Sequence, residues 1–345
     1  MANYTFRVTV AIMGNTQEIE AALQRLCPEF LPGGGDVVGL KRLSGGASQE
    51  TWSFDVVSKH GRQAQLILRR APGGEATARS SAAIGLEKEA ELIRSAGEAG
   101  VPAPQVTYVC RREDRLGEAY VMERLEGETI APKILRSDQF STSRERLARQ
   151  CGSALARIHA LKLDSLPALP VSNGPDQIDQ YEQIYLSFDT PKPVFEVAMA
   201  WLRANQPAAL AEVLVHGDFR LGNLVVDPDG LVGVLDWELA HVGNPREDIA
   251  WICINSWRFG HATKRVGGFG ELEDLLGAYI DAGGCEISPS EIDWWEVLGS
   301  FKWGVMCMIM YEAFRSGADP SVERAAIGRR VSETEIDILN LLERV

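Results

Sequence analysis

Hydrophobic and polar positions alternate along the first third of the chain in the way that half-buried β-strands require. Five segments of this kind are predicted strands: Val37–Leu43, Glu50–Val57, Gln63–Arg70, Val106–Cys110 and Ala119–Glu123. Between the third and the fourth, apolar residues recur with a helical period over residues 82–98. The pattern therefore predicts a small lobe of five strands and one helix.

After the predicted hinge Leu125-Glu126-Gly127, the apolar spacing becomes mostly helical. The predicted helices cover residues 140–162, 192–205, 246–257, 270–282, 290–315 and 331–343. Ahead of the first strand, capping-box spacing of Asn15 and Glu18 predicts a short helix over Thr16–Leu26. We therefore expect an N-terminal extension over residues 1–36, a sheet lobe over 37–125 and a helical lobe over 126–345.

Composition narrows the class of protein. The chain has 345 residues, of which 45% are hydrophobic, so it can bury a large core. The net charge of −13 argues against general binding to nucleic acids or anionic membranes. Six cysteines are scattered without CxxC spacing, which indicates reduced thiols in a cytoplasmic protein instead of a disulfide framework or a zinc site.

The candidate chemistry lies in His216-Gly217-Asp218, followed by Asn223 and later by Asp236. The spacing H-x-D-x-x-x-x-N is that of a protein-kinase catalytic loop. In such a site one Asp accepts a hydroxyl proton, while Asn and the second Asp hold Mg²⁺ against a nucleotide. Taken singly, Asp and Asn are common turn formers and His216 could be a buried structural histidine, but the joint spacing favours catalysis.

A hairpin is predicted between the two candidate metal ligands. The apolar runs 224–226 and 231–235 flank Asp227-Pro228-Asp229-Gly230, a strong turn signal. Asn223 stands at the entrance of the hairpin and Asp236 at its exit. Because the ends of an antiparallel pair are adjacent, an amide and a carboxylate meet there, and oxygen ligands of this kind suit Mg²⁺.

A second group of candidates belongs to the sheet lobe. The glycine-rich turn Ser44-Gly45-Gly46-Ala47-Ser48 joins the first two predicted strands, and its backbone amides can approach phosphate oxygens. On the third strand Arg69 is the candidate cation for those phosphates, because strand alternation points Arg70 to the other face. Glu89 on the following helix is the candidate partner of Arg69, with a solvated helix face as the alternative.

Several longer stretches carry a family likeness: LSGGASQETW, LILRRAP, EKEAELIRSAGEAGVPAPQV, YVMERLEG, LVHGDFRLGN, GVLDWELAHVGNPREDIAW and AAIGRRVSETEIDILNLL. From about residue 38 to its end, the chain resembles the aminoglycoside phosphotransferase family. It is most similar to the subgroup resembling the kinase-like domain fused to some acyl-CoA dehydrogenases. The resemblance implies an α+β, protein-kinase-like two-lobe fold, with a small N-terminal antiparallel-sheet lobe and a larger, mainly helical C-terminal lobe.

The resemblance also implies roles for residues of the helical lobe. Asp218 would be the catalytic base, and Asn223 and Asp236 would bind Mg²⁺. Asp248 matches a family acid that braces the catalytic loop, and it can also compensate charge at a helix N-terminus. The segment that begins with Asp236 reads D-W-E where protein kinases have D-F-G.

In the sheet lobe, the resemblance implies nucleotide binding. Ser44 to Ser48 would cover the phosphates, and Arg69 with Glu89 would orient them. Many relatives carry Lys where Arg69 stands, and Arg keeps the charge with a different geometry. Glu123, Arg124 and Leu125 would contact adenine through backbone groups.

Together these features predict an ATP-dependent and Mg²⁺-dependent phosphotransferase that acts on a hydroxyl of a small metabolite or aminoglycoside-like compound. No A-P-E segment follows the metal motif, which argues against a protein substrate. The acceptor is expected near the hairpin and the helices of about 175–205 and 255–315, where aromatic residues at helical spacing are usually core. These aromatic residues are Tyr181, Tyr185, Trp201, Trp257, Phe259, Trp294, Trp295 and Trp303.

Two other classes compete with this prediction. One is a nucleotide-binding regulatory protein with the same fold and no turnover, against which the intact Asp218, Asn223 and Asp236 argue. The other is a metal-dependent hydrolase, which leaves the glycine-rich turn, the third-strand cation and the hinge without a role. Transfer of phosphate from ATP to a hydroxyl compound would separate the kinase from both.

Overall fold

The computed structural model describes residues 2–43, 49–61, 63–74 and 83–345, with side chains from residue 16 onward. The chain divides into two compact units. Unit 1 comprises Met1–Glu98 and Ala103–Glu126, and unit 2 comprises Ala99–Pro102 and Gly127–Val345. Unit 1 is built on an antiparallel sheet and unit 2 is mainly helical, as the sequence pattern predicts.

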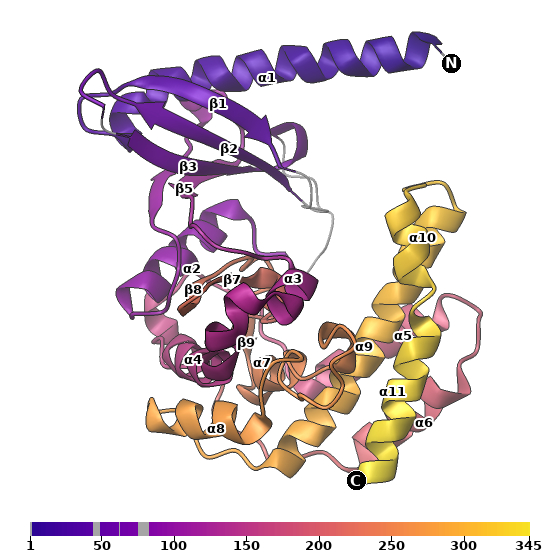
Figure 1. The fold of residues 1–345 in the computed structure, drawn as a ribbon. Coiled ribbons are helices and arrows are strands. Elements are labelled where there is room, and N and C mark those ends of the chain that lie inside the picture. Colours follow the sequence, from indigo (N-terminus) through magenta and orange to yellow (C-terminus); the bar gives the residue numbers. More distant parts are fainter. Residues whose placement is uncertain (1, 44–48, 62, 75–82) are drawn as a thin grey trace. The chain divides into compact units, whose positions relative to one another are not determined.

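The sheet of unit 1 has five antiparallel strands in the order β1-β2-β3-β5-β4 (Figure 1). Their bounds are β1 Asp36–Arg42, β2 Glu50–Val57, β3 Gln63–Arg70, β4 Val106–Val109 and β5 Ala119–Glu123, with short 3₁₀ turns at Pro72–Gly74 and Arg112–Asp114. Alternate residues of β2 are buried, and Trp52, Phe54 and Val56 form the core with Leu66 and Leu68 of β3. Alternation alone therefore identified the strands correctly.

The N-terminal helix is longer than the sequence predicts. Helix α1 runs over Ala2–Phe30 and packs on β1 and β4, where the expected helix covered only Thr16–Leu26. Apolar side chains at helical spacing continue past Leu26 to Cys27 and Phe30, and both are buried in the core of unit 1. The capping signal at Asn15 does not begin the helix, because the backbone is already helical before it.

Helix α2 begins later than predicted and runs over Leu86–Glu98. Its start follows Gly85, whose φ of 83° lies outside the helical region. Leu86, Ala90 and Ile93 are buried, and the helix packs on β4 and β5. The predicted glycine-rich turn Ser44–Ser48 lies outside the described residues.

In unit 2 the α-helices are α3 Ala131–Arg136, α4 Ser141–His159, α5 Gly174–Leu186, α6 Pro193–Ala204, α7 Arg246–Trp251, α8 Leu272–Asp281, α9 Pro289–Arg315, α10 Val322–Gly328 and α11 Val331–Arg344. The 3₁₀ turns are η3 Asp138–Phe140, η4 Leu163–Ser165, η5 Leu221–Asn223 and η6 Asn255–Trp257. Helix α9 is mostly buried, and α5, α6, α7, α10 and α11 pack on it (Figure 1).

The predicted helix over 246–257 is wrong as one continuous element. It consists of α7 and η6, because Ile254 between them adopts an extended ψ of 134°. The short helices α3 and α10 were not predicted, since six or seven residues hold too few apolar positions to show a period.

Two short ribbons complete unit 2. Strand β6 Val213–Val215 pairs with β9 His241–Gly243, and β7 Leu224–Asp227 pairs with β8 Gly230–Val234. The second ribbon is the predicted hairpin, and its turn is closed by the Asp227 carboxylate, which accepts hydrogen bonds from the amides of Asp229 and Gly230. Turn chemistry of this kind explains why the hairpin is legible from sequence.

Candidate functional site

The loop after β6 makes a sharp turn that brings Asp218 next to its partners. Gly217 has a φ of 83°, and a Cβ atom there would lie 2.4 Å from the carbonyl oxygen of Leu239. Both facts require glycine at this position. The carboxylate of Asp218 comes out of the turn half-buried, with 16% of its side chain exposed.

Asp218 accepts hydrogen bonds from three side chains. Its Oδ1 lies 2.9 Å from Arg220 Nε and 2.7 Å from the indole nitrogen of Trp251. Its Oδ2 lies 2.6 Å from Asn223 Nδ2 and 3.2 Å from Arg220 Nε. Hydrogen bonds to an ionised acceptor are about twice as strong as neutral ones, so this cluster holds the carboxylate in one orientation.

His216 is a neutral structural histidine. Its Nδ1 accepts the amide hydrogen of Asp218 at 3.2 Å, so its Nε2 carries the proton and donates to the carbonyl of Leu235 at 3.1 Å. Complete burial lowers the pKa of His216, against the opposing effect of nearby carboxylates such as Asp248. The geometry therefore fits the alternative that His216 is a buried structural histidine. The loop that it supports carries Asp218.

Asp248 on α7 holds the backbone of the same loop. Its carboxylate accepts the amide hydrogens of His216 at 2.8 Å and Gly217 at 3.0 Å. It also lies 3.2 Å from His159 Nε2, and His159 Nδ1 lies 2.9 Å from the Tyr279 hydroxyl. Burial raises the pKa of Asp248, but the hydrogen bonds from His159 and the loop outweigh it and the net shift is downward. Asp248 is therefore a buried carboxylate with donors on both oxygens.

Helix α7 has a second buried anchor one residue earlier. Glu247 accepts from Lys302 of α9 at 2.8 Å, Gln177 of α5 at 2.7 Å and His241 of β9 at 3.1 Å. Burial opposes both charges, yet their attraction raises the pKa of Lys302 and lowers that of Glu247. Because Asp248 and Trp251 stand on the same short helix, this ion pair fixes the element that contacts Asp218.

The two candidate metal ligands stand at adjacent ends of the β7–β8 hairpin, as predicted. The amide of Leu235 donates to the carbonyl of Asn223 at 2.8 Å, one residue before Asp236. Asn223 Nδ2 donates both to the backbone oxygen of Asp218 at 2.9 Å and to its Oδ2, which leaves Asn223 Oδ1 as the candidate ligand atom. Asp236 has a φ of 67°.

This donor set fits Mg²⁺, which binds through one or two protein oxygens together with phosphates and water. No group of three or more His, Cys, Asp or Glu side chains arranged around a common metal position occurs within the described part of the chain. A site that depends on an amide, one carboxylate and phosphate oxygens is compatible with that finding.

Three indole rings pack at tilted angles beside Asp218. The ring centroid of Trp257 lies 5.6 Å from that of Trp251 and 4.7 Å from that of Trp303, and the Arg220 guanidinium lies 4.9 Å from the centroid of Trp257. Of the aromatic residues named from the sequence, those that are buried are Tyr185, Trp257, Trp294, Trp295 and Trp303. Their core role is confirmed, and an acceptor-binding role stays a prediction.

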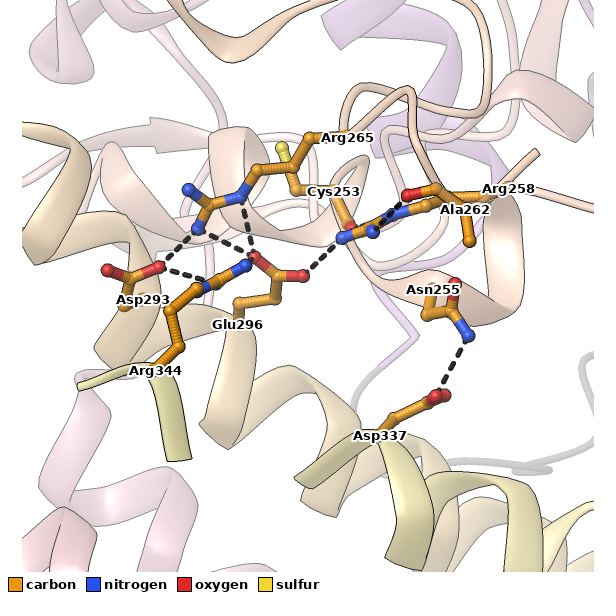
Figure 2. Close-up of polar contacts among 9 residues, drawn as sticks. All are labelled: Cys253, Asn255, Arg258, Ala262, Arg265, Asp293, Glu296, Asp337 and Arg344. Carbon is orange, nitrogen blue, oxygen red and sulfur yellow. Dashed lines mark hydrogen bonds and ion pairs between the residues drawn. The ribbon is translucent and has the colours of Figure 1, made fainter. Parts of the chain in front are cut away.

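The segment that carries Trp257 is tied to α9 and α11 by a polar network (Figure 2). Arg258 donates to the buried Glu296 at 2.5 Å, and Asn255 donates to Asp337 of α11 at 2.8 Å. Arg265 bridges Glu296 and Asp293, and Arg344 at the end of α11 also reaches Asp293. The C-terminal helix thereby helps to place the ring on which Arg220 stacks.

In unit 1, Arg69 and Glu89 form an ion pair. Arg69 Nη2 lies 3.2 Å from Glu89 Oε1, which also accepts from the Tyr120 hydroxyl at 3.1 Å. Glu89 is fully buried, so the alternative of a solvated helix face is wrong. Arg70 points to the other face, as strand alternation predicts, and pairs with Glu50 at 3.1 Å.

The predicted hinge follows β5. The amides of Glu123 and Arg124 donate to the carbonyls of Gln105 at 2.8 Å and Gln65 at 2.9 Å. Backbone contacts of this segment with adenine would therefore use carbonyl oxygens or the Leu125 amide. The adenine role of Glu123, Arg124 and Leu125 stays a prediction.

Sequence reasoning missed three side chains of the unit 2 site. Arg220 lies inside the quoted motif, but nothing in its spacing shows that it folds back onto Asp218. Trp251 is 33 residues from Asp218, and Lys302 is 55 residues from Glu247. A buried Trp and a Lys within an apolar helix are signals that they matter, but they do not identify a partner.

Among curated proteins, this chain is similar to mouse acyl-CoA dehydrogenase family member 10. It is 32% identical over 198 residues, which cover 55% of this chain and 18% of the relative. The chain spans less than half the length of the first curated relatives that it matches.

No helix among the described residues has both the length and the apolar character needed to cross a membrane.

Solved structures share the fold. A protein from Ralstonia eutropha JMP134 assigned to the aminoglycoside phosphotransferases superposes with a TM-score of 0.72 at 21% identity, covering 94% of this chain and 98% of that one. The streptomycin–ATP ternary complex of APH(2″)-IIa superposes with a TM-score of 0.56 at 18% identity, covering 84% and 89%. These likenesses confirm the predicted α+β, protein-kinase-like two-lobe fold.

A family model described as the phosphotransferase enzyme family matches residues 39–290. That range contains both the Arg69–Glu89 pair and the cluster around Asp218. The chain belongs to the phosphotransferase enzyme family.

Proposed function

We propose that this protein transfers the terminal phosphoryl group of ATP to a hydroxyl group of a small molecule, with Mg²⁺ as cofactor. The observation that carries the proposal is the hydrogen-bonded cluster of Asp218 and Asn223 on a loop whose backbone is held by Asp248. The family and the ATP complex of a relative with the same fold support nucleotide use.

Asp218 is the proposed general base. Its carboxylate would accept the proton of the acceptor hydroxyl while the new O–P bond forms and the bond from the terminal phosphorus to the bridging oxygen of ADP breaks. Asn223 Oδ1 and Asp236 would hold Mg²⁺, which supplies positive charge to the phosphate oxygens when it is bound. Trp251 would keep Asp218 oriented towards the acceptor.

The proposed nucleotide contacts of unit 1 are the Arg69–Glu89 pair, the turn Ser44–Ser48 and the hinge residues Glu123, Arg124 and Leu125. Glu89, which accepts from the Tyr120 hydroxyl, and Gln49, which accepts from Arg69 Nε at 3.1 Å, restrain the guanidinium plane of Arg69. Arg69 can therefore present a fixed cation to phosphate oxygens. Because Glu89 neutralises part of the Arg69 charge, Arg69 would orient the phosphate oxygens more than it would attract them.

The acceptor class follows from the groups around Asp218. Besides Asn223, they are indole rings and the Arg220 cation. Of the carboxylates on α7, Asp248 is engaged by the loop amides and Glu247 is neutralised by Lys302 and His241. A polycationic aminoglycoside would find little negative charge among these residues. A hydroxyl compound with an apolar body and neutral or anionic oxygen groups would fit them better.

The test is a screen of hydroxyl-bearing metabolites and aminoglycosides with Mg·ATP and with Mg·GTP, in which release of the nucleoside diphosphate is measured. Phosphorus NMR of the product should show a new phosphomonoester. The variant Asp218→Asn should bind the nucleotide and release no diphosphate, since it keeps the shape and loses the base. Nucleotide binding by the wild-type protein without transfer to any acceptor would favour the regulatory alternative.

A further inference from the structure

The carboxylate of Asp218 is surrounded by donors in the structure as it stands. Trp251 donates to Oδ1 and Asn223 donates to Oδ2, while the single hydrogen of Arg220 Nε is shared between the two oxygens. A hydroxyl group that is to give its proton to Asp218 therefore competes with one of these donors for the carboxylate.

Of the three donors, Arg220 is the one that can leave. Trp251 is buried at the end of α7, and Asn223 is 6% exposed and also bonded to the backbone of Asp218. The Arg220 side chain is 27% exposed, and its guanidinium rests on the face of Trp257, which imposes no hydrogen-bond direction. Its bonds to Asp218 use only Nε, which spans both oxygens.

We propose that Arg220 is a gate on the catalytic base that opens when the terminal phosphate of the nucleotide arrives. The inference rests on the proposed function. In the unliganded protein Arg220 pairs with Asp218, and in the complex it moves to the terminal phosphate oxygens and frees a carboxylate lone pair for the acceptor hydroxyl. The guanidinium matches phosphate oxygens in geometry as well as charge. The base is thereby available only when a phosphoryl group is present to be transferred.

Gly222 makes the resting position of Arg220 possible. A Cβ atom on Gly222 would lie 2.4 Å from Arg220 Nη1. Gly222 precedes Asn223 in the turn η5, and its φ is not in the left-handed region. Gly222→Ala should therefore displace the guanidinium from Asp218 without straining the backbone and without removing the cation.

The experiment measures dissociation constants for the Mg²⁺ complexes of a non-hydrolysable ATP analogue and of ADP by calorimetry. The wild-type protein should prefer the triphosphate. Arg220→Gln should lose about tenfold in affinity for the triphosphate and about twofold or less for ADP. Gly222→Ala should keep or increase the preference, because the cation no longer has to leave Asp218. Arg149→Gln, which removes an exposed partner of Asp281, is the matched control and should change neither constant.

Tryptophan fluorescence supplies a readout that a merely structural role would not move. Departure of Arg220 from Trp257 should change the emission on binding of the triphosphate, and Trp257→Phe and Arg220→Gln should each remove most of that change. If Arg220→Gln folds poorly, Arg220→Lys is the variant to measure. It keeps a cation and should retain part of the triphosphate preference.

An unchanged triphosphate preference in Arg220→Gln would overturn the gate. So would a loss of preference in Gly222→Ala equal to that in Arg220→Gln, because the resting contact would then belong to the binding-competent form. A wild-type protein that binds neither nucleotide would instead overturn the proposed function, and the gate with it.

Discussion

The indole nitrogen of Trp251 lies 2.7 Å from Oδ1 of Asp218. This contact joins the end of α7 to the centre of the proposed chemistry. It is made by a neutral donor to a carboxylate, so it orients Asp218 without adding a competing charge. Because the same helix holds the loop backbone through Asp248, α7 sets both the position and the direction of the Asp218 carboxylate.

Trp251→Phe should lower kcat about tenfold to a hundredfold with little change in nucleotide affinity, because it removes one hydrogen bond to a charged group and keeps most of the ring packing. The measurement is diphosphate release with the acceptor found in the screen. Trp295→Phe is a matched control, since Trp295 is also buried and its indole nitrogen has no partner among the described residues. Equal effects of the two substitutions would show that packing, not the hydrogen bond, matters.

Asp236→Asn should remove the Mg²⁺-dependent part of nucleotide affinity, with a rise in Kd of about tenfold or more. Asn is the suitable replacement because it tolerates the left-handed conformation at a φ of 67°, where Ala would add strain. Calorimetry with Mg²⁺ and with EDTA separates the two parts. Asp229→Asn, in the exposed turn of the same hairpin, should leave both values unchanged, and a similar loss there would contradict a metal role specific to Asp236.

Asp248→Asn should destabilise unit 2 by about 3 kcal/mol, because a buried carboxylate that accepts from two loop amides and from His159 becomes an amide with one acceptor oxygen. Thermal unfolding followed by circular dichroism measures the loss. Asp274→Asn changes an exposed acid of α8 and should have no measurable effect. A stable Asp248→Asn protein with normal turnover would contradict the prediction that Asp248 holds the backbone of the loop.

His216 should make stability depend on pH in the weakly acidic range. Its pKa in the folded protein is lowered by burial, so its contribution is complete above its unfolded pKa of about 6.5 and is lost as the pH falls through the folded value. As the pH decreases from 6.5, the free energy of unfolding of the wild-type protein should decrease relative to that of the His216→Asn variant. The decrease should be at most about 1.4 kcal/mol per pH unit.

The comparison between the two proteins is what isolates His216. The pKa of His241 is raised by Glu247 despite burial, so its contribution is complete below its unfolded pKa and is lost as the pH rises. The two histidines therefore act in opposite directions, and the slope of the wild-type curve alone mixes them. Urea titrations of both proteins at several pH values between 7 and 5 give the two free energies of unfolding. A constant difference between the two over this range would contradict the prediction.

Local pattern was enough for much of this protein. Alternation in β2 reports burial on one face of a sheet, and the Asp227 to Gly230 turn closes through its own side-chain hydrogen bonds. The face of Arg69 follows from the period of two, and the adjacency of Asn223 and Asp236 follows from the hairpin. Each of these depends on neighbours within a few residues or on one strand pairing.

Sequence by itself thus determined the sheet, the hairpin and the residue types that are proposed to bind phosphate and metal. Only the tertiary structure decided that Arg220 and Trp251 both donate to Asp218, that Lys302 neutralises Glu247, and that α7 ends before η6. Arg220 lies only two residues from Asp218, and its guanidinium is placed by the face of Trp257. For Trp251 and Lys302 the physical reason is that the contacts join side chains far apart in the chain. Their partners are selected by the packing of α7 against α9 and by the need to pair each buried charge, and no local period records either.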